Sequence, residues 1–110
     1  MIKLKRNYGD INITNGAINS IISETIKEID GIELDKGLTR EIASKIGVQT
    51  EEIKIAADFN KLSITMELRA KLGTQLTSKG YEVQRKIYEI MGKLTTVTPH
   101  NVDVLFTRLY

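Results

Sequence analysis

The chain has 110 residues, of which 41% are hydrophobic, with a formal net charge of +2 at pH 7 and no cysteine. This length fits one domain over residues 1–110, and the lack of cysteine excludes disulfides, thiolate zinc sites and a cysteine nucleophile. The charge is too small to indicate nucleic-acid binding by itself, and no stretch approaches the roughly 20 apolar residues of a membrane span.

The residues before position 15 predict a short strand. Ile11 and Ile13 alternate with polar neighbours, which is the period of a half-buried strand. Ile2 and Leu4 continue the alternation earlier in the chain, with an interruption at 7–9. These two residues belong either to a true strand or to an arm that docks onto a neighbouring copy, because a free edge strand offers assembly by strand addition.

An amphipathic helix is predicted next. Thr14 or Asn15 offers an N-cap, and Gly31 suits the left-handed residue that ends a helix. Between them an apolar stripe recurs at three- and four-residue spacing, which is typical of a helix with one buried face. The stripe consists of Ile18, Ile21, Ile22, Ile26 and Ile29.

The middle of the chain predicts short elements that lead into a hairpin. Residues 32–34 form either a short strand or an extended exit from the helix. Apolar positions within 38–46 indicate a second, shorter helix that ends at Gly47. Residues 53–57 alternate again, and 58–61 make a tight turn into the next strand.

The strongest pattern begins at Leu62. A strict alternation predicts a long strand with one buried side, formed by Leu62, Ile64, Met66, Leu68, Ala70 and Leu72. A last helix follows, capped by Thr77 or Ser78, with its apolar side at Val83, Ile87, Ile90, Met91 and Leu94. Pro99 breaks the chain before a final strand with Val102, Val104 and Phe106 on one side.

Together these elements predict an α+β fold. One-sided alternation in the strands favours a small antiparallel or mixed sheet with two main helices packed on one face, together with the extra short helix. Gly80 of the last helix allows close approach to the sheet.

The chain offers no recognisable reaction chemistry. His100 is the only histidine, in a turn, and Asp103 is the only acid near it. Phosphate-binding, dinucleotide-binding and nucleophile-elbow glycine motifs are all missing. We therefore expect no enzyme activity, no catalytic residues, no metal site and no cofactor.

Charge is distributed unevenly, and this points to an interaction surface. The first helix and its exit carry Glu24, Glu28, Asp30 and Glu33, whereas the last helix carries Lys79, Arg85, Lys86 and Lys93. These are either two solvated faces or the acidic end of one copy docking on the basic helix of another. An RNA- or ribosome-binding stripe is the alternative, since Tyr81 and Tyr88 lie among the basic residues.

Three local patterns together resemble the alkaline shock protein family of Gram-positive bacteria, also called the general stress protein family. The first is Gly9 to Thr14 (GDINIT) leading into a helix that closes as EIDGI at 28–32. The second is Leu72-Gly73 followed by Val83-Gln84 and Ile87. The third is the closing strand VDVLF at 102–106.

The chain also departs from the family pattern. The tyrosine before the family's glycine is Leu72 here, and the family's Met-Thr-Gly-Leu helix ending reads Leu94-Thr95-Thr96-Val97. The asparagine of the family's last strand is Asp103, and 33–52 has no clear counterpart. The chain therefore looks like a divergent member.

The resemblance implies a setting and partners rather than a reaction. It implies a cytoplasmic, non-enzymatic protein tied to cell-envelope homeostasis and to alkaline or general stress. Some relatives self-assemble, and some are held at the inner face of the membrane by a separate anchoring protein. Others are linked to control of fatty-acid synthesis at acetyl-CoA carboxylase. The expected partners are thus the chain itself and an envelope-linked or membrane-anchoring protein, without direct membrane insertion and with nucleic acid only as the alternative.

Overall fold

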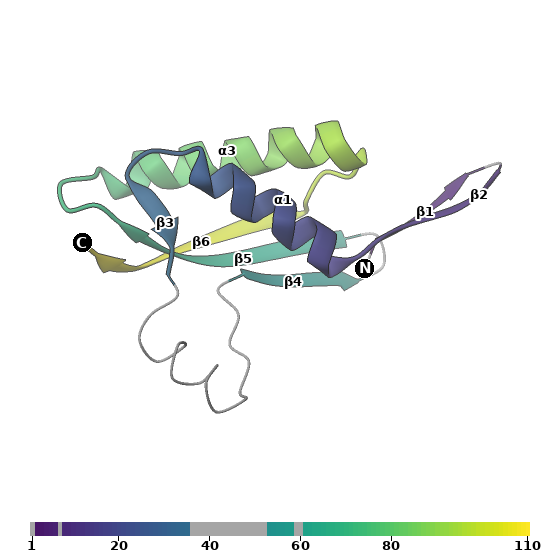
Figure 1. Ribbon diagram of the computed structural model, residues 1–110, viewed down its shortest axis with the longest axis horizontal. Helices are drawn as coiled ribbons and strands as arrows, with labels where there is room; N and C mark the ends of the chain where they lie inside the picture. The colour runs from purple at the N-terminus through teal and green to yellow at the C-terminus, as the bar shows by residue number, and fades with distance from the viewer. Residues whose placement is uncertain (1, 7, 36–52, 59–60) are drawn as a thin grey trace, which may run out of the picture.

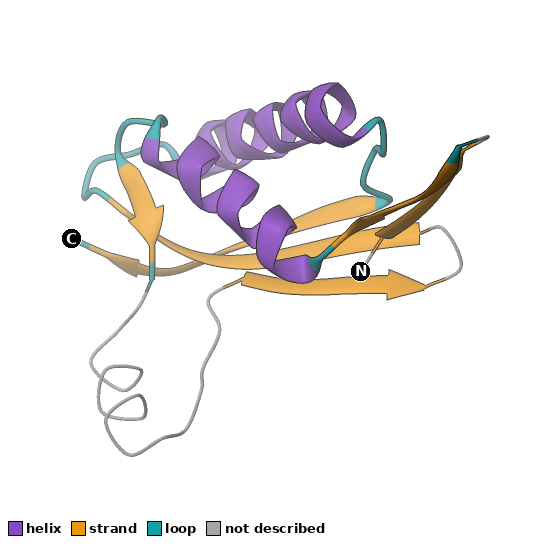
Figure 2. Ribbon diagram, turned by 45° about the vertical axis from the view of Figure 1, so that its right-hand side comes forward, coloured by secondary structure: helices purple, strands orange, loops and turns teal. Residues whose placement is uncertain are grey.

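The computed structural model describes residues 2–6, 8–35, 53–58 and 61–110 (Figure 1). Two helices lie side by side on one face of a sheet, and a two-stranded hairpin projects from one end (Figures 1 and 2). In chain order the elements are β1 (Ile2–Arg6), β2 (Gly9–Ile13), α1 (Asn15–Lys27), β3 (Ile32–Leu34), β4 (Ile53–Asp58), β5 (Lys61–Ala70), α3 (Leu76–Thr95) and β6 (Asn101–Leu109).

The strand β5 is the centre of the main sheet. On one edge it pairs antiparallel with β4, through Ile55 opposite Ile64, and further along with β3. On the other edge it pairs parallel with β6, through Ile64 opposite Val102. The sheet is therefore mixed and covered by helices on one face, which confirms the predicted α+β fold. Residues 32–34 form a strand, and the predicted short helix within 38–46 lies outside the described residues.

The core lies between the sheet and the two helices. Alternation along β5 places every second side chain on the helix side, where apolar residues from α1 and α3 meet it. Each fully buried aliphatic side chain contributes roughly 1.5–3 kcal/mol. The fully buried large side chains are Ile18, Ile22, Ile26, Ile53, Leu62, Ile64, Met66, Leu68, Val83, Ile87 and Met91.

The pattern ends earlier than expected at Leu72, which is 74% exposed. The chain leaves β5 after Ala70 and turns at Gly73, whose φ of +97° suits glycine. Leu72 instead donates its backbone N–H to the carbonyl of Tyr110 at 2.6 Å. The apolar alternation in the sequence therefore runs past the end of β5, and its last member, Leu72, lies in the turn that follows the strand.

The ends of α1 are fixed by local hydrogen bonds. Thr14 is the N-cap, and its hydroxyl accepts from the N–H of Ala17 at 3.1 Å. The helix ends at Lys27 with Glu28 as its right-handed C-cap. Gly31, with a φ of +82°, therefore lies in the following loop and is not the helix cap that the sequence predicts.

The ends of α3 also differ from the prediction. Gln75 is the N-cap, because its side-chain oxygen accepts from the N–H of Ser78 at 2.8 Å. At the other end Thr95 is buried, whereas Leu94 is 59% exposed. The buried residues of α3 repeat every four positions, at 83, 87, 91 and 95, so the buried side rotates away from Leu94.

The hairpin β1–β2 is a sheet of its own, and we call it the arm. It extends beyond the body at the end where α1 begins (Figure 1). Its base touches the core through Ile2 and Ile13, while Tyr8 at its tip is fully exposed. Ile2 and Leu4 therefore belong to a true strand, which is the first of the two alternatives that the sequence left open.

Candidate functional site

The acidic members of the predicted interaction surface lie at the end of α1 and in the chain leading through β3. Glu24 pairs with Lys27 at 3.1 Å, and Glu33 pairs with Arg69 of the neighbouring strand. Glu28 and Asp30 are exposed and have no ion-pair partner among the described residues. Glu24 and Glu33 thus already have a cationic neighbour in the chain, whereas Glu28 and Asp30 have none among the described residues.

The basic members lie along α3. Lys79 is paired with Glu82 at 3.2 Å and is only partly exposed. Arg85 and Lys93 are exposed and Lys86 is half-buried, and none of the three has an ion-pair partner within the described part of the chain. The structure therefore leaves a basic strip of Arg85, Lys86 and Lys93, which points away from the core.

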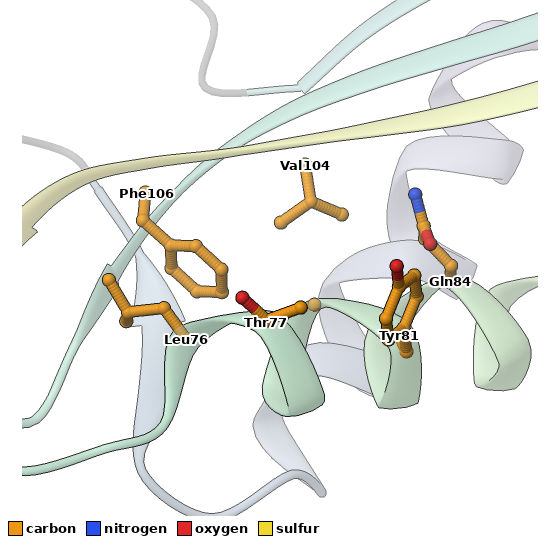
Figure 3. Close-up of a pocket in the computed structure, with 7 residues that line it drawn as sticks. Leu76, Thr77, Tyr81, Gln84, Val104 and Phe106 are labelled. Carbon is orange, nitrogen blue, oxygen red and sulfur yellow. The ribbon is translucent and has the colours of Figure 1, made fainter.

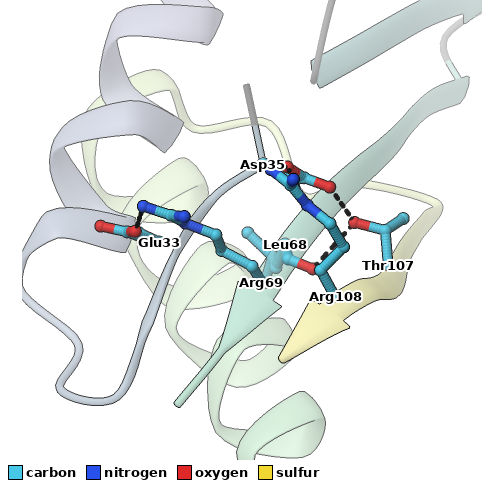
Figure 4. A network of polar contacts seen from close by, with 6 residues as sticks. All are labelled: Glu33, Asp35, Leu68, Arg69, Thr107 and Arg108. Carbon is cyan, nitrogen blue, oxygen red and sulfur yellow. Dashed lines mark hydrogen bonds and ion pairs between the residues drawn. The ribbon is translucent and has the colours of Figure 1, made fainter. Parts of the chain in front are cut away.

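A polar cluster that the sequence did not suggest lies on the sheet face opposite the helices (Figure 4). The carboxylate of Asp35, just after β3, accepts from the Arg108 Nε at 3.1 Å and from the Thr107 hydroxyl. Arg69 pairs with Glu33, and its guanidinium lies 4.8 Å above the ring of Tyr110.

We call Asp35, Thr107 and Arg108 the clasp, because their hydrogen bonds join the two edges of the sheet. Asp35 follows β3 on one edge of β5, whereas Thr107 and Arg108 belong to β6 on the other edge. A bulge at this point of β6 shifts the register by one residue, between the pairs Leu68–Phe106 and Arg69–Arg108. The side chains thus cross over β5 and tie both edges of the sheet together. Because the partners are more than seventy residues apart in the chain, no local pattern could have indicated them.

A shallow groove of about 250 Å³ lies between the first half of α3 and β6 (Figure 3). Phe106 and Val104 form its sheet side, and Tyr81, which is 68% exposed, forms part of its helix side. A methyl group at Gly80 would lie 3.6 Å from the Phe106 ring, which is an ordinary van der Waals distance, so the spacing of α3 and β6 does not require the glycine that the sequence suggested for a close approach. The lining residues are Leu76, Thr77, Gly80, Tyr81, Gln84, Val104 and Phe106, none of them charged.

The structure also bears on the histidine and on metal binding. His100 is exposed, and its backbone carbonyl accepts from the Tyr88 hydroxyl at 3.3 Å. Among residues 2–6, 8–35, 53–58 and 61–110, no three His, Asp or Glu side chains are grouped to hold a metal ion. Within the same residues, no helix is long and apolar enough to cross a membrane.

Comparison with known proteins gives one match. The profile of the alkaline shock protein family, described as having a cell envelope-related function, matches residues 3–109. No curated protein and no solved structure matches the chain. The matched range includes both the arm and the last strand, so it covers the basic strip, the clasp and the groove.

Proposed function

The chain belongs to the alkaline shock protein family, which has a cell envelope-related function, and from this premise we propose that it is a non-enzymatic scaffold or adaptor in bacterial envelope homeostasis and stress response. It works by associating with itself and with an envelope-linked or membrane-anchoring protein. Its place is the cytoplasm, with a peripheral position at the inner face of the membrane reached through that partner.

The basic strip on α3 is the observation that carries this proposal. Arg85 and Lys93 are exposed and have no ion-pair partner in the described residues. Exposed Glu89 lies between them, so the strip has an excess of positive charge rather than a single sign. Such an excess on a rigid helix favours an acidic partner surface, because it steers encounter and fixes orientation. The acidic pair Glu28 and Asp30 offers such a surface on a second copy, and an acidic patch on another protein offers a second.

Sedimentation velocity of the purified full chain, over a range of concentrations at low and high salt, tests self-association. We expect species larger than a dimer to grow with concentration. A monomer under all conditions would contradict the self-association part of the proposal. Loss of growth at high salt would assign the contact to the charged faces, since salt screens exposed charges over about 10 Å at 0.1 M.

The charged faces have their own test. Reversing both Arg85→Glu and Lys86→Glu should abolish any salt-sensitive association and leave the fold intact, because neither residue contributes to the core. Reversing Lys54→Glu, at an exposed position on β4 away from α3, is the matched control and should retain it. Association that is unchanged in the double variant would rule out this surface.

An RNA- or ribosome-associated module remains the second candidate, because exposed Tyr81 lies beside the basic strip. Its affinity for single-stranded RNA would fall steeply with salt. A protein regulator of fatty-acid synthesis is a third role for the same surface. Gene neighbours separate the roles: a membrane-anchor gene favours the scaffold, and carboxylase genes favour the regulator.

A further inference from the structure

The arm carries an apolar face that the body does not cover fully. In its register Ile2 lies opposite Ile13 and Leu4 opposite Ile11, so all four aliphatic side chains share one face. Ile2 and Ile13 pack at the core, but Ile11 is 48% exposed further out. A lone two-stranded hairpin is marginal in water, and one with an exposed apolar face gains stability by docking.

The opposite face of the arm is polar, with the exposed residues Lys3 and Asp10 on it. The strand β1 carries Lys3, Lys5 and Arg6, whereas Asp10 is the one acid of β2. Lys3 forms an ion pair with Asp10 at 3.4 Å. Both of these side chains are exposed, so this face of the arm suits a polar neighbour.

The surface that we match to the arm is the outer edge of β6. Within the described residues β6 pairs with β5 alone, so its other edge has no strand beside it. At the start of that edge Gln84 of α3 donates to the Val102 carbonyl at 2.9 Å. Further along, β6 runs beside the uncharged groove, past Val104 and Phe106 (Figure 3).

We infer that the arm of one copy adds as a strand to the open edge of β6 in the next copy, with Leu4 and Ile11 over the groove. This arrangement gives the apolar face and the polar face of the arm a suitable neighbour each. The apolar face of the arm continues the Val104–Phe106 side of β6, next to the uncharged flank of α3. Its polar face, which includes Lys3, then lies on the same side as Asp103, which is exposed on the other side of β6.

The inference rests on the self-association proposed above and identifies the two surfaces that would meet, the arm of one copy and β6 of the next. The arm extends from the end of the molecule where α1 begins, whereas the groove lies at the start of α3, toward the other end (Figure 1). A contact between two different surfaces of identical chains repeats from copy to copy, so it builds open chains unless the rotation closes a ring. Because the contact is largely apolar, it persists at high salt, unlike association through the charged faces.

Cysteine cross-linking tests the contact, because the chain has no cysteine of its own. A full-length Ile11→Cys protein is mixed with a full-length Tyr81→Cys protein under mild oxidation. We expect the two to form a mixed disulfide, since a disulfide requires Cα atoms within about 7 Å. Ile11→Cys mixed with Leu94→Cys, an exposed apolar position at the other end of the same helix as Tyr81, is the matched control and should not cross-link.

A second pair of variants keeps the test valid if cysteine perturbs either surface. Ile11→Asp disables the arm, and Thr77→Lys with Tyr81→Lys disables the groove, all at exposed positions. Each protein alone should be at least about tenfold weaker in self-association. Their mixture should form a one-to-one dimer, because one contributes an intact arm and the other an intact groove.

Each other outcome has a definite meaning. A wild type that associates while the arm and groove variants associate equally well would overturn this inference and leave the proposed function standing. So would variants that fail to pair when mixed, or cross-linking that is equal in the control. A wild type that stays monomeric at every concentration would overturn both.

Discussion

Asp35 shows at the level of one residue how the sheet is held together. Its side chain is only 10% exposed, and both of its oxygens accept hydrogen bonds, from Arg108 and from Thr107. Hydrogen bonds to a charged group contribute more than neutral ones, about 1.5–3 kcal/mol each. Because these bonds join strands on opposite edges of β5, they fix the end of β3 relative to β6.

Replacing Asp35→Asn should lower the free energy of unfolding by about 1–3 kcal/mol, because the shape is kept while the charge on Arg108 loses its partner. Urea unfolding measures the change. A double-mutant cycle with Arg108→Gln should give a coupling energy above about 0.5 kcal/mol. Independent, additive effects of the two substitutions would show that the clasp does not stabilise the fold.

Thr96 decides how α3 ends. It has a φ of +59°, and its N–H donates to the Gly92 carbonyl at 3.1 Å, which closes the last turn. A left-handed conformation costs a residue with a Cβ roughly 1–2 kcal/mol, so glycine is preferred there. The family pattern places a glycine at this position, and the structure gives the physical reason for that glycine.

Thr96→Gly should therefore stabilise the protein by about 0.5–1 kcal/mol, after part of the gain is lost to the greater freedom of glycine in the unfolded chain. Thermal unfolding monitored by circular dichroism measures it. Thr98→Gly, at an exposed neighbour without a positive φ, is the control and should be neutral or destabilising. A lower melting temperature for Thr96→Gly would refute this account of the helix end.

At the scale of the whole molecule, the chain divides into a packed body and a projecting arm. The body is built around β5, which is paired on both edges and buried on one face. The arm joins that body only at its base, through Ile2 and Ile13. Local stability should therefore differ greatly between the two, because opening the arm breaks few core contacts.

Hydrogen exchange followed by mass spectrometry measures this difference. In dilute solution the backbone amides of β1 and β2 should exchange far faster than those of β5. At concentrations where the chain associates, the arm amides and those of β6 should slow together, because a docked arm pairs with that edge. Arm protection that is high and independent of concentration would contradict both the free arm and its docking.

The candidate surfaces were only partly predictable. Sequence identified Arg85, Lys86 and Lys93 because charges at regular spacing on a helix are visible in one segment. It also included Glu24, Glu33 and Lys79, which the structure places in ion pairs within the chain. The pairing of Glu33 with Arg69 depends on strand register, which no single segment specifies.

The sequence by itself determined the helices and strands of the described residues and most of their buried faces. Alternation from Leu62 and the isoleucine stripe of α1 depend only on the period of a strand or a helix, so local spacing is enough to predict them. Tertiary structure decided what separate segments build together. The clasp of Asp35 with Arg108 and the groove between Tyr81 and Phe106 exist only because β6 lies parallel to β5 and beneath α3. Such contacts arise from packing between distant segments, and a single linear pattern contains no information on which of them meet.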